Sequence, residues 1–228
     1  MLFFDSTYIL IIIALIISLA VQGYMKSTFS KYSEVRSASG LTGARAAERI
    51  LQSAGLSYVK ITYTRGELTD HYDPETKSLA LSEQVYHATS LAAIGVAAHE
   101  CGHAIQDATG YGPLRTRASL VPIANIGSAL SWPLFFIGLI SSFKPLILAG
   151  IIFFCAALLF QIVTLPVEFN ASSRALSLLK STGILSAQEI EGSGKVLRAA
   201  AMTYVAAVAA SALQLLRLIL LARRNSRD

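Results

Sequence analysis

Four long apolar runs constrain this chain more than any other feature. About 20 apolar residues are needed for a helix to cross a bilayer, and a soluble domain usually has about 25% charged residues. Here 54% of the 228 residues are hydrophobic and 14% are charged. The composition excludes a disordered chain and predicts a mainly α, multi-span membrane protein with about four transmembrane helices. The runs are residues 7–21, 120–140, 146–165 and 199–221.

Two of the four runs have an alternative interpretation. The first resembles the apolar region of a signal peptide, but only Asp5 precedes it and no basic residue does, which favours a retained anchor helix. The second and third are separated by five residues and predict a tight helical hairpin. The fourth contains Gln214 and Arg217, so it either crosses the membrane or lies along the interface.

The charged residues concentrate between the first and second runs. Residues 25–118 hold ten of the 19 basic and nine of the 14 acidic residues, which predicts a water-facing domain. The pattern predicts helices over 42–54 and 90–109, and strands over 59–64 and 78–81 with a turn at Asp73–Pro74, giving a small α+β domain with a short β-hairpin or sheet. The expected segments are an N-terminal anchor (1–24), this domain (25–118), a transmembrane hairpin (119–165), a membrane-face helical segment (166–198), a transmembrane or interfacial helix (199–222) and a basic tail (223–228).

The motif that carries chemistry lies in the second predicted helix of that domain. His99-Glu100-Cys101-Gly102-His103 is an HExxH sequence. Residues four apart share one helical face, so the two imidazoles can bind the same Zn²⁺ ion. Glu100 is adjacent to the first histidine and is placed to take a proton from the attacking water. The motif predicts one zinc ion per chain, bound by His99 and His103, with Glu100 as the catalytic base.

A catalytic zinc ion needs a third protein ligand. The choices are two further histidines, His71 and His87, and several carboxylates, of which Glu168 is the best. The motif precedes the second run and Glu168 follows the third, so two crossings return the chain to the same membrane face. Pro166 is expected to open a new helical segment there, which would carry Glu168 and Ser172 on one face.

Four separated motifs together resemble the YugP-like family of bacterial membrane zinc metallopeptidases. They are Asp70–Pro74, Ala98–Gln106, Thr164–Glu168 and Ala200–Ala206. The resemblance implies a gluzincin-like fold around the site, distantly similar to the HtpX and Ste24 proteases. It also implies His99, His103 and Glu168 as metal ligands and Glu100 as catalytic base. HtpX-type proteases tend to have Asp four residues after the glutamate ligand, where this chain has Ser172, so the hydrogen bonding around the ligands is expected to differ.

Residues that stabilise the transition state are harder to identify. Peptide hydrolysis needs a donor for the tetrahedral oxyanion. The candidates are Tyr204, Arg174, His71 and Tyr86, each with an ordinary structural role as the alternative. The strand that ends near Leu81 is a candidate edge for main-chain hydrogen bonds to an extended substrate.

These patterns favour a membrane-anchored zinc endopeptidase that acts on membrane or misfolded proteins. A zinc-stabilised scaffold or adaptor would have the same ligands, and a site-two-type intramembrane protease is disfavoured because the apolar stretch before the motif has only eight residues. The net charge of +5 is attributed to the membrane face and not to nucleic acid. The family resemblance implies a multi-pass protein of the bacterial plasma membrane, and the excess of basic residues on the motif side predicts that its zinc site is in the cytoplasm. Protein or peptide substrates and the lipid bilayer are the expected partners, and the oligomeric state is not predicted.

Overall fold

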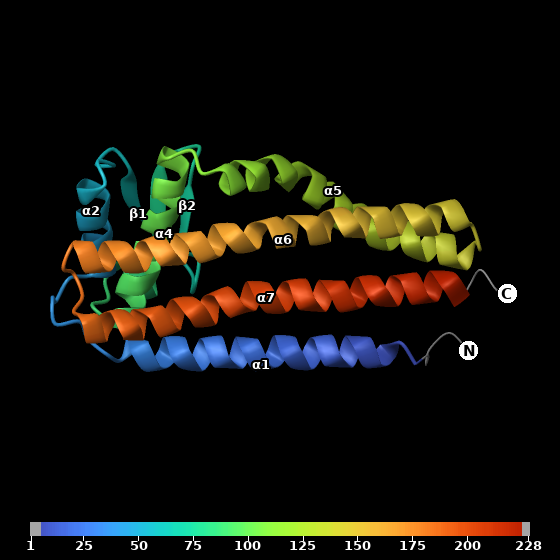
Figure 1. The fold of residues 1–228 in the computed structure, drawn as a ribbon, viewed down its shortest axis with the longest axis horizontal. Helices are drawn as coiled ribbons and strands as arrows, with labels where there is room; N and C mark the ends of the chain where they lie inside the picture. Colours follow the sequence, from blue (N-terminus) through green and yellow to red (C-terminus); the bar gives the residue numbers. More distant parts are fainter. Residues whose placement is uncertain (1–5, 225–228) are drawn as a thin grey trace. The chain divides into compact units, whose positions relative to one another are not determined.

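The computed structural model describes residues 6–224 and is mainly helical (Figure 1). Asp5 and most of the predicted basic tail lie outside the described residues, and only Arg223 and Arg224 of that tail are within them. The elements in chain order are α1 (Tyr8–Ser33), α2 (Gly43–Ser53), β1 (Lys60–Thr64), β2 (His71–Asp73), β3 (Ser78–Ser82), α3 (Glu83–Tyr86), α4 (Leu91–Ala108), α5 (Gly112–Ile140), α6 (Lys144–Ser181) and α7 (Ala187–Arg224).

The chain divides into two compact units, which we describe separately. Unit 1 comprises residues 1–22, 115–166 and 203–228, and unit 2 comprises residues 23–114 and 167–202. The helices α1, α5, α6 and α7 are each long and apolar enough to cross a membrane. With 38 residues each, α6 and α7 measure about 57 Å, so each is longer than one span of roughly 30 Å requires. The prediction of a mainly α, multi-span protein with a small sheet is confirmed.

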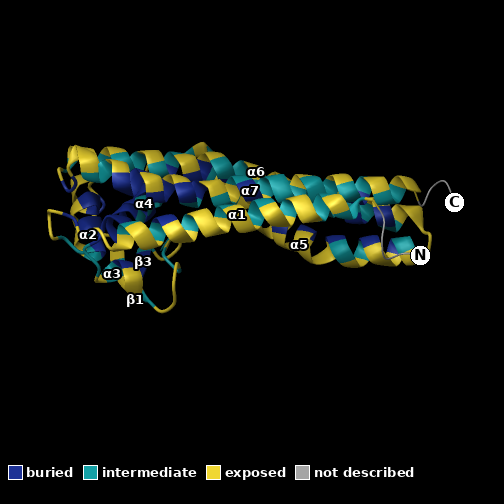
Figure 2. Cartoon of the chain, turned by 90° about the horizontal axis from the view of Figure 1, so that it is seen from below, coloured by how far each residue is buried: buried dark blue, intermediate teal, exposed yellow. Residues whose placement is uncertain are grey.

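Unit 1 contains the apolar parts of these four helices. Large apolar side chains such as Leu15 are exposed along them, as expected for helices that face lipid (Figure 2). Phe135, Ile147 and Leu218 form a small buried cluster between helices. The guanidinium group of Arg217 lies over the ring of Tyr8, 4.7 Å from its centroid, so this basic residue of the fourth run has an aromatic partner.

Pro166 does not open a new helix, contrary to the sequence prediction. α6 runs without a break from Lys144 to Ser181 with Pro166 inside it. A proline in a helix interior removes one backbone donor and usually kinks or ends the helix. Proline is tolerated inside transmembrane helices because neighbouring groups compensate for the lost hydrogen bond, and α6 is long and apolar enough to be one. Glu168 therefore lies on the continuation of the third predicted span.

Unit 2 contains the sheet, which has the strand order β1-β3-β2. β1 pairs with β3 in parallel and β2 pairs with β3 antiparallel. The predicted small sheet is confirmed, and it has a third strand that was not predicted: β2 ends at the predicted turn and forms an antiparallel hairpin with β3. β3 is the central strand, so residues 78–82 cannot offer a free edge, and the expectation that they align a substrate is also wrong.

The helices α2 and α4 pack together to form most of the core of unit 2. Both helices begin at a capping residue: the side chain of Thr42 accepts a hydrogen bond from the backbone N–H of Arg45, and Ser90 accepts one from Ala93. The buried side chains include Ala46, Ala47 and Ile50 of α2 and a run of alanines in α4. Small side chains let the two helices approach closely, which fixes the position of α4 in unit 2.

Candidate metal centre

The HExxH sequence lies in the buried middle of α4 (Figure 2). α4 packs against α6 at Gly102, where a Cβ atom would lie only 2.5 Å from the carbonyl oxygen of Ala171. The glycine therefore lets the two backbones touch. This contact brings the part of α6 that includes Glu168 to the face of α4 that includes the histidines.

Three side chains meet at this contact. Nε2 of His99 lies 3.3 Å from Oε2 of Glu168, and Nε2 of His103 lies 3.7 Å from the same oxygen. Each of the three residues offers a ligand atom within 4.8 Å of the others, and among residues 6–224 they form the one such group. Two ligands of a tetrahedral zinc ion, each about 2.1 Å from the metal, are about 3.4 Å apart. The observed separations and the N, N, O donor set both fit zinc.

The three groups are also matched electrostatically. Burial alone would raise the pKa of the Glu168 carboxyl, but the neighbouring imidazoles of His103 and His99 hold this pKa well below its ordinary value. Burial opposes protonation of His103, but the carboxylates of Glu168 and Glu100 outweigh it and raise the pKa of His103. Glu168 is therefore a carboxylate at neutral pH, the form that binds a metal ion.

The neighbouring residues differ between the two histidines. Nδ1 of His99 lies 3.1 Å from the hydroxyl of Ser172, the position at which the HtpX-type pattern has Asp. Nδ1 of His103 lies 3.0 Å from Oε1 of Gln106. Glu100, the predicted base, is 7% exposed and adjacent to His99 in the chain. Both histidines thus have Nδ1 in a hydrogen bond and Nε2 towards Glu168.

Sequence reasoning missed Gln106 and Asn170. Gln106 is completely buried, and its Nε2 donates to the carbonyl oxygen of Val167 at 2.8 Å and to Oδ1 of Asn170 at 3.0 Å. One signal was available: Gln106 follows His103 by three residues and so shares its face of α4. Asn170 had no comparable signal, because its role depends on the packing of α6 against α4.

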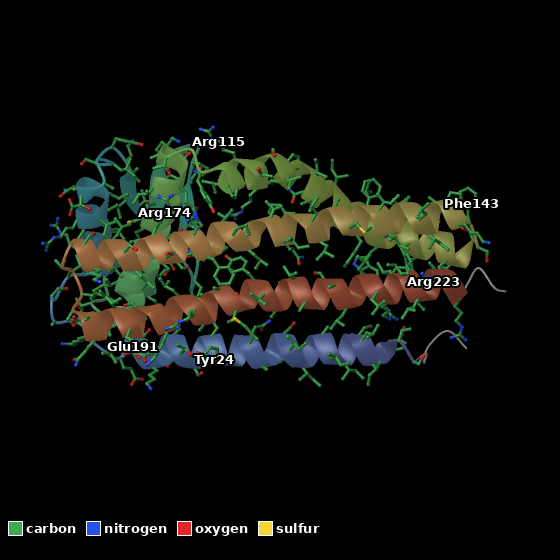
Figure 3. The ribbon with its side chains drawn as sticks, viewed as in Figure 1. Tyr24, Arg115, Phe143, Arg174, Glu191 and Arg223 are labelled. Carbon is green, nitrogen blue, oxygen red and sulfur yellow. The ribbon has the colours of Figure 1, made fainter. Side chains whose placement is uncertain are left out.

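The other candidate residues are not gathered at the triad to the same degree. His71 lies in β2, is exposed, and its Nδ1 is 2.8 Å from the carbonyl oxygen of Thr69. Tyr86 packs against the ring of His87 in T-shaped geometry. Arg174, labelled in Figure 3, lies on α6; its Nε donates to Oδ1 of Asn170, and its guanidinium group lies 5.9 Å from the ring centroid of Tyr111. Tyr204 lies on α7 in unit 1, 38% exposed, and its predicted role stays a prediction.

Cys101 lies inside the motif but on the opposite face of α4. It is fully buried, and its thiol donates to the carbonyl oxygen of Ala47 in α2 at 3.7 Å. Burial raises the pKa of this thiol well above its ordinary value. It therefore packs as a neutral side chain between α2 and α4.

Comparisons with known proteins agree on one class. Residues 7–223 match the family model described as "Putative neutral zinc metallopeptidase". The chain is 48% identical over 219 residues to "Putative membrane protease YugP" of Bacillus subtilis (strain 168), which covers 96% of this chain and 97% of that protein. No solved structure matches the chain.

Proposed function

Because this chain belongs to the family of neutral zinc metallopeptidases, we propose that it is a membrane-anchored endopeptidase of the gluzincin type. His99, His103 and Glu168 bind one zinc ion, and Glu100 is the catalytic base. The observation that carries the proposal is the meeting of the three ligand atoms at separations of 3.3 and 3.7 Å. The zinc cofactor that the sequence predicted is the cofactor of this family.

The chemistry divides between the metal and the side chains. Zinc, when bound, acts as a Lewis acid that polarises a carbonyl group, and it lowers the pKa of water to about 7. Glu100 accepts the proton of the attacking water and later delivers it to the leaving amine. Its burial removes competing solvent from this proton transfer. Tyr204 and His71 remain the candidates for the oxyanion donor.

The edge strand β2 is the proposed docking site for an extended substrate. β2 is joined to α4, because the hydroxyl of Tyr72 donates to Oδ2 of Asp107 at 2.8 Å. Lys77, in the turn between β2 and β3, binds the same oxygen at 2.6 Å. A peptide paired with the free edge of β2 would be held by main-chain hydrogen bonds, which accept many sequences. This suits unfolded or membrane proteins as substrates.

The charge distribution supports a plasma-membrane location with the site in the cytoplasm. Residues 25–118 and 166–198, the proposed water-facing segments, contain 14 of the 19 basic residues. Lys144, Arg223, Arg224 and Arg227 lie on the other side of the predicted spans. A reporter fused after Lys144 tests this topology: it should be active only outside the cytoplasm.

The test of the proposed function is Glu100→Gln, assayed with labelled casein as an unfolded protein. We expect unchanged zinc content and a loss of cleavage of about 10²- to 10⁴-fold, the usual contribution of a general base. Glu67→Gln, an exposed glutamate outside the site, is the matched control and should cleave normally. Full activity of Glu100→Gln would refute the role of Glu100. A zinc-loaded wild-type protein that cleaves nothing would favour the scaffold or adaptor.

A further inference from the structure

Gln106 connects the two helices that provide the proposed ligands. It lies in α4, where its Oε1 is within hydrogen-bond distance of Nδ1 of His103. Its Nε2 donates two hydrogen bonds to residues of α6. Its two contacts on α6, Val167 and Asn170, flank Glu168 in the chain. Gln106 is fully buried, so water cannot replace these hydrogen bonds.

The direction of every hydrogen bond in this chain of contacts is fixed by its ends. A backbone carbonyl oxygen only accepts, so the group of Gln106 that faces Val167 must be its NH₂ group. A guanidinium group only donates, so Arg174, at 2.8 Å from Asn170, requires Oδ1 of Asn170 to face it. That same Oδ1 is the second acceptor for Gln106. Two independent ends therefore impose one orientation on the amide of Gln106.

This orientation of the Gln106 amide determines whether Nδ1 of His103 carries a proton. Oε1 of Gln106 can only accept, so Nδ1 of His103 must carry a proton. In a neutral imidazole the lone pair is then on Nε2, the atom that faces Glu168. We propose that Gln106 is a positioning residue that holds His103 as its Nδ1–H tautomer, with Nε2 prepared for the metal before the metal binds. This rests on the proposed zinc site.

The other histidine lacks this constraint. The partner of His99 is the hydroxyl of Ser172, which can donate or accept. Ser172 therefore imposes no tautomer on His99 in the way that Gln106 does on His103. The two ligands are expected to behave differently in the metal-free protein.

The tautomer can be measured without activity or metal. The chain has four histidines, so ¹⁵N-histidine spectra of the full protein in detergent can be assigned by single substitutions. Metal-free protein is studied in a series of increasing pH, because Glu168 and Glu100 raise the pKa of His103 above its ordinary value, and the tautomer is read where the spectrum itself shows His103 to be neutral. We expect His103 as the Nδ1–H form in the wild type and Nε2–H in Gln106→Met. Gln52→Met, an exposed glutamine of α2, is the control and should leave the tautomer unchanged.

Zinc affinity provides the second readout. Loss of a residue that orients a ligand typically weakens metal binding about 10- to 100-fold, and we expect this range for Gln106→Met. A wild-type His103 in the Nε2–H form would overturn the proposal, and that spectrum needs no variant to fold. An unchanged tautomer in Gln106→Met would overturn it too. Absence of zinc binding in the wild type would instead refute the proposed function, since the tautomer is measured without metal.

Discussion

The contact at Gly102 makes a quantitative prediction about the metal centre. In Gly102→Ala the new Cβ would lie 2.5 Å from the carbonyl oxygen of Ala171 and 3.1 Å from its C and Cα atoms. A carbon and an oxygen atom in ordinary contact are about 3.3 Å apart. The two backbones must therefore separate by about 0.8 Å. All three atoms of Ala171 belong to the backbone, so no side-chain rotation can relieve the clash.

A shift of this size is large for a metal centre. Ligand distances in a working site lie within about 0.2 Å of their ideal values. Glu168 is on α6 and both histidines are on α4, so separation of the helices moves the ligands apart directly. We expect zinc affinity to fall by about tenfold or more, and the overpacked contact to cost about 1–3 kcal/mol of stability.

The matched control is Gly194→Ala in α7. There the nearest atom to a new Cβ is Cδ1 of Leu176 at 3.6 Å, an ordinary contact. Alanine in a helix interior is favoured over glycine by about 0.5–1 kcal/mol, so this variant should be slightly more stable and bind zinc normally. Affinity is measured by competition with a chelator, and stability by thermal unfolding in detergent. A Gly102→Ala protein with wild-type affinity and melting temperature would show that α4 and α6 are not in backbone contact.

Three further predictions concern stability. Ser90→Ala removes the N-cap of α4 and should destabilise unit 2 by about 1 kcal/mol, read as a lower melting temperature; an unchanged melting temperature would refute the cap. The hydroxyl of Thr76 and the backbone N–H of Glu75 hold the pKa of Asp73 below its ordinary value. The Asp73 carboxylate therefore stabilises the fold above about pH 4, and this stabilisation is lost as the pH falls through the lowered pKa. Asp73→Asn should therefore melt below the wild type at pH 7 and equal to it in acid; an equal difference at both pH values would contradict this. Chelation of zinc should lower the melting temperature, and zinc but not magnesium should restore it, because magnesium prefers oxygen ligands in octahedral geometry; recovery with magnesium would argue against a His, His, Glu site.

Features with a strong local signal were predictable from the sequence. The four apolar runs predicted the helices α1, α5, α6 and α7, because length and hydropathy alone determine whether a segment suits lipid. The helices predicted over 42–54 and 90–109 correspond to α2 and α4. The HExxH spacing placed two imidazoles on one face of α4, and the number of crossings selected Glu168 as the residue to meet them.

Features that depend on distant contacts were not predictable. β2 has three residues, too few to show an alternating pattern, and it exists because it pairs with β3. Pro166 was assigned to a helix start by a rule for soluble helices, which does not hold in a long apolar helix. The role of Gln106 could not be found from spacing alone, because its partners Val167 and Asn170 are 61 and 64 residues away.

The rate at which the buried thiol of Cys101 is alkylated measures the unfolding of unit 2 without reference to the metal. An alkylating reagent can reach Cys101 only when α2 leaves α4, since the thiol lies between these helices and faces away from the three ligands. The other cysteine, Cys155, lies in the apolar part of α6 that is proposed to face lipid, so it is replaced by alanine before labelling. The labelling rate of Cys101 then reports how often α2 and α4 separate. A chelator that removes zinc without changing this rate would leave unit 2 folded, and one that raises the rate would show that the ion holds α4 in place.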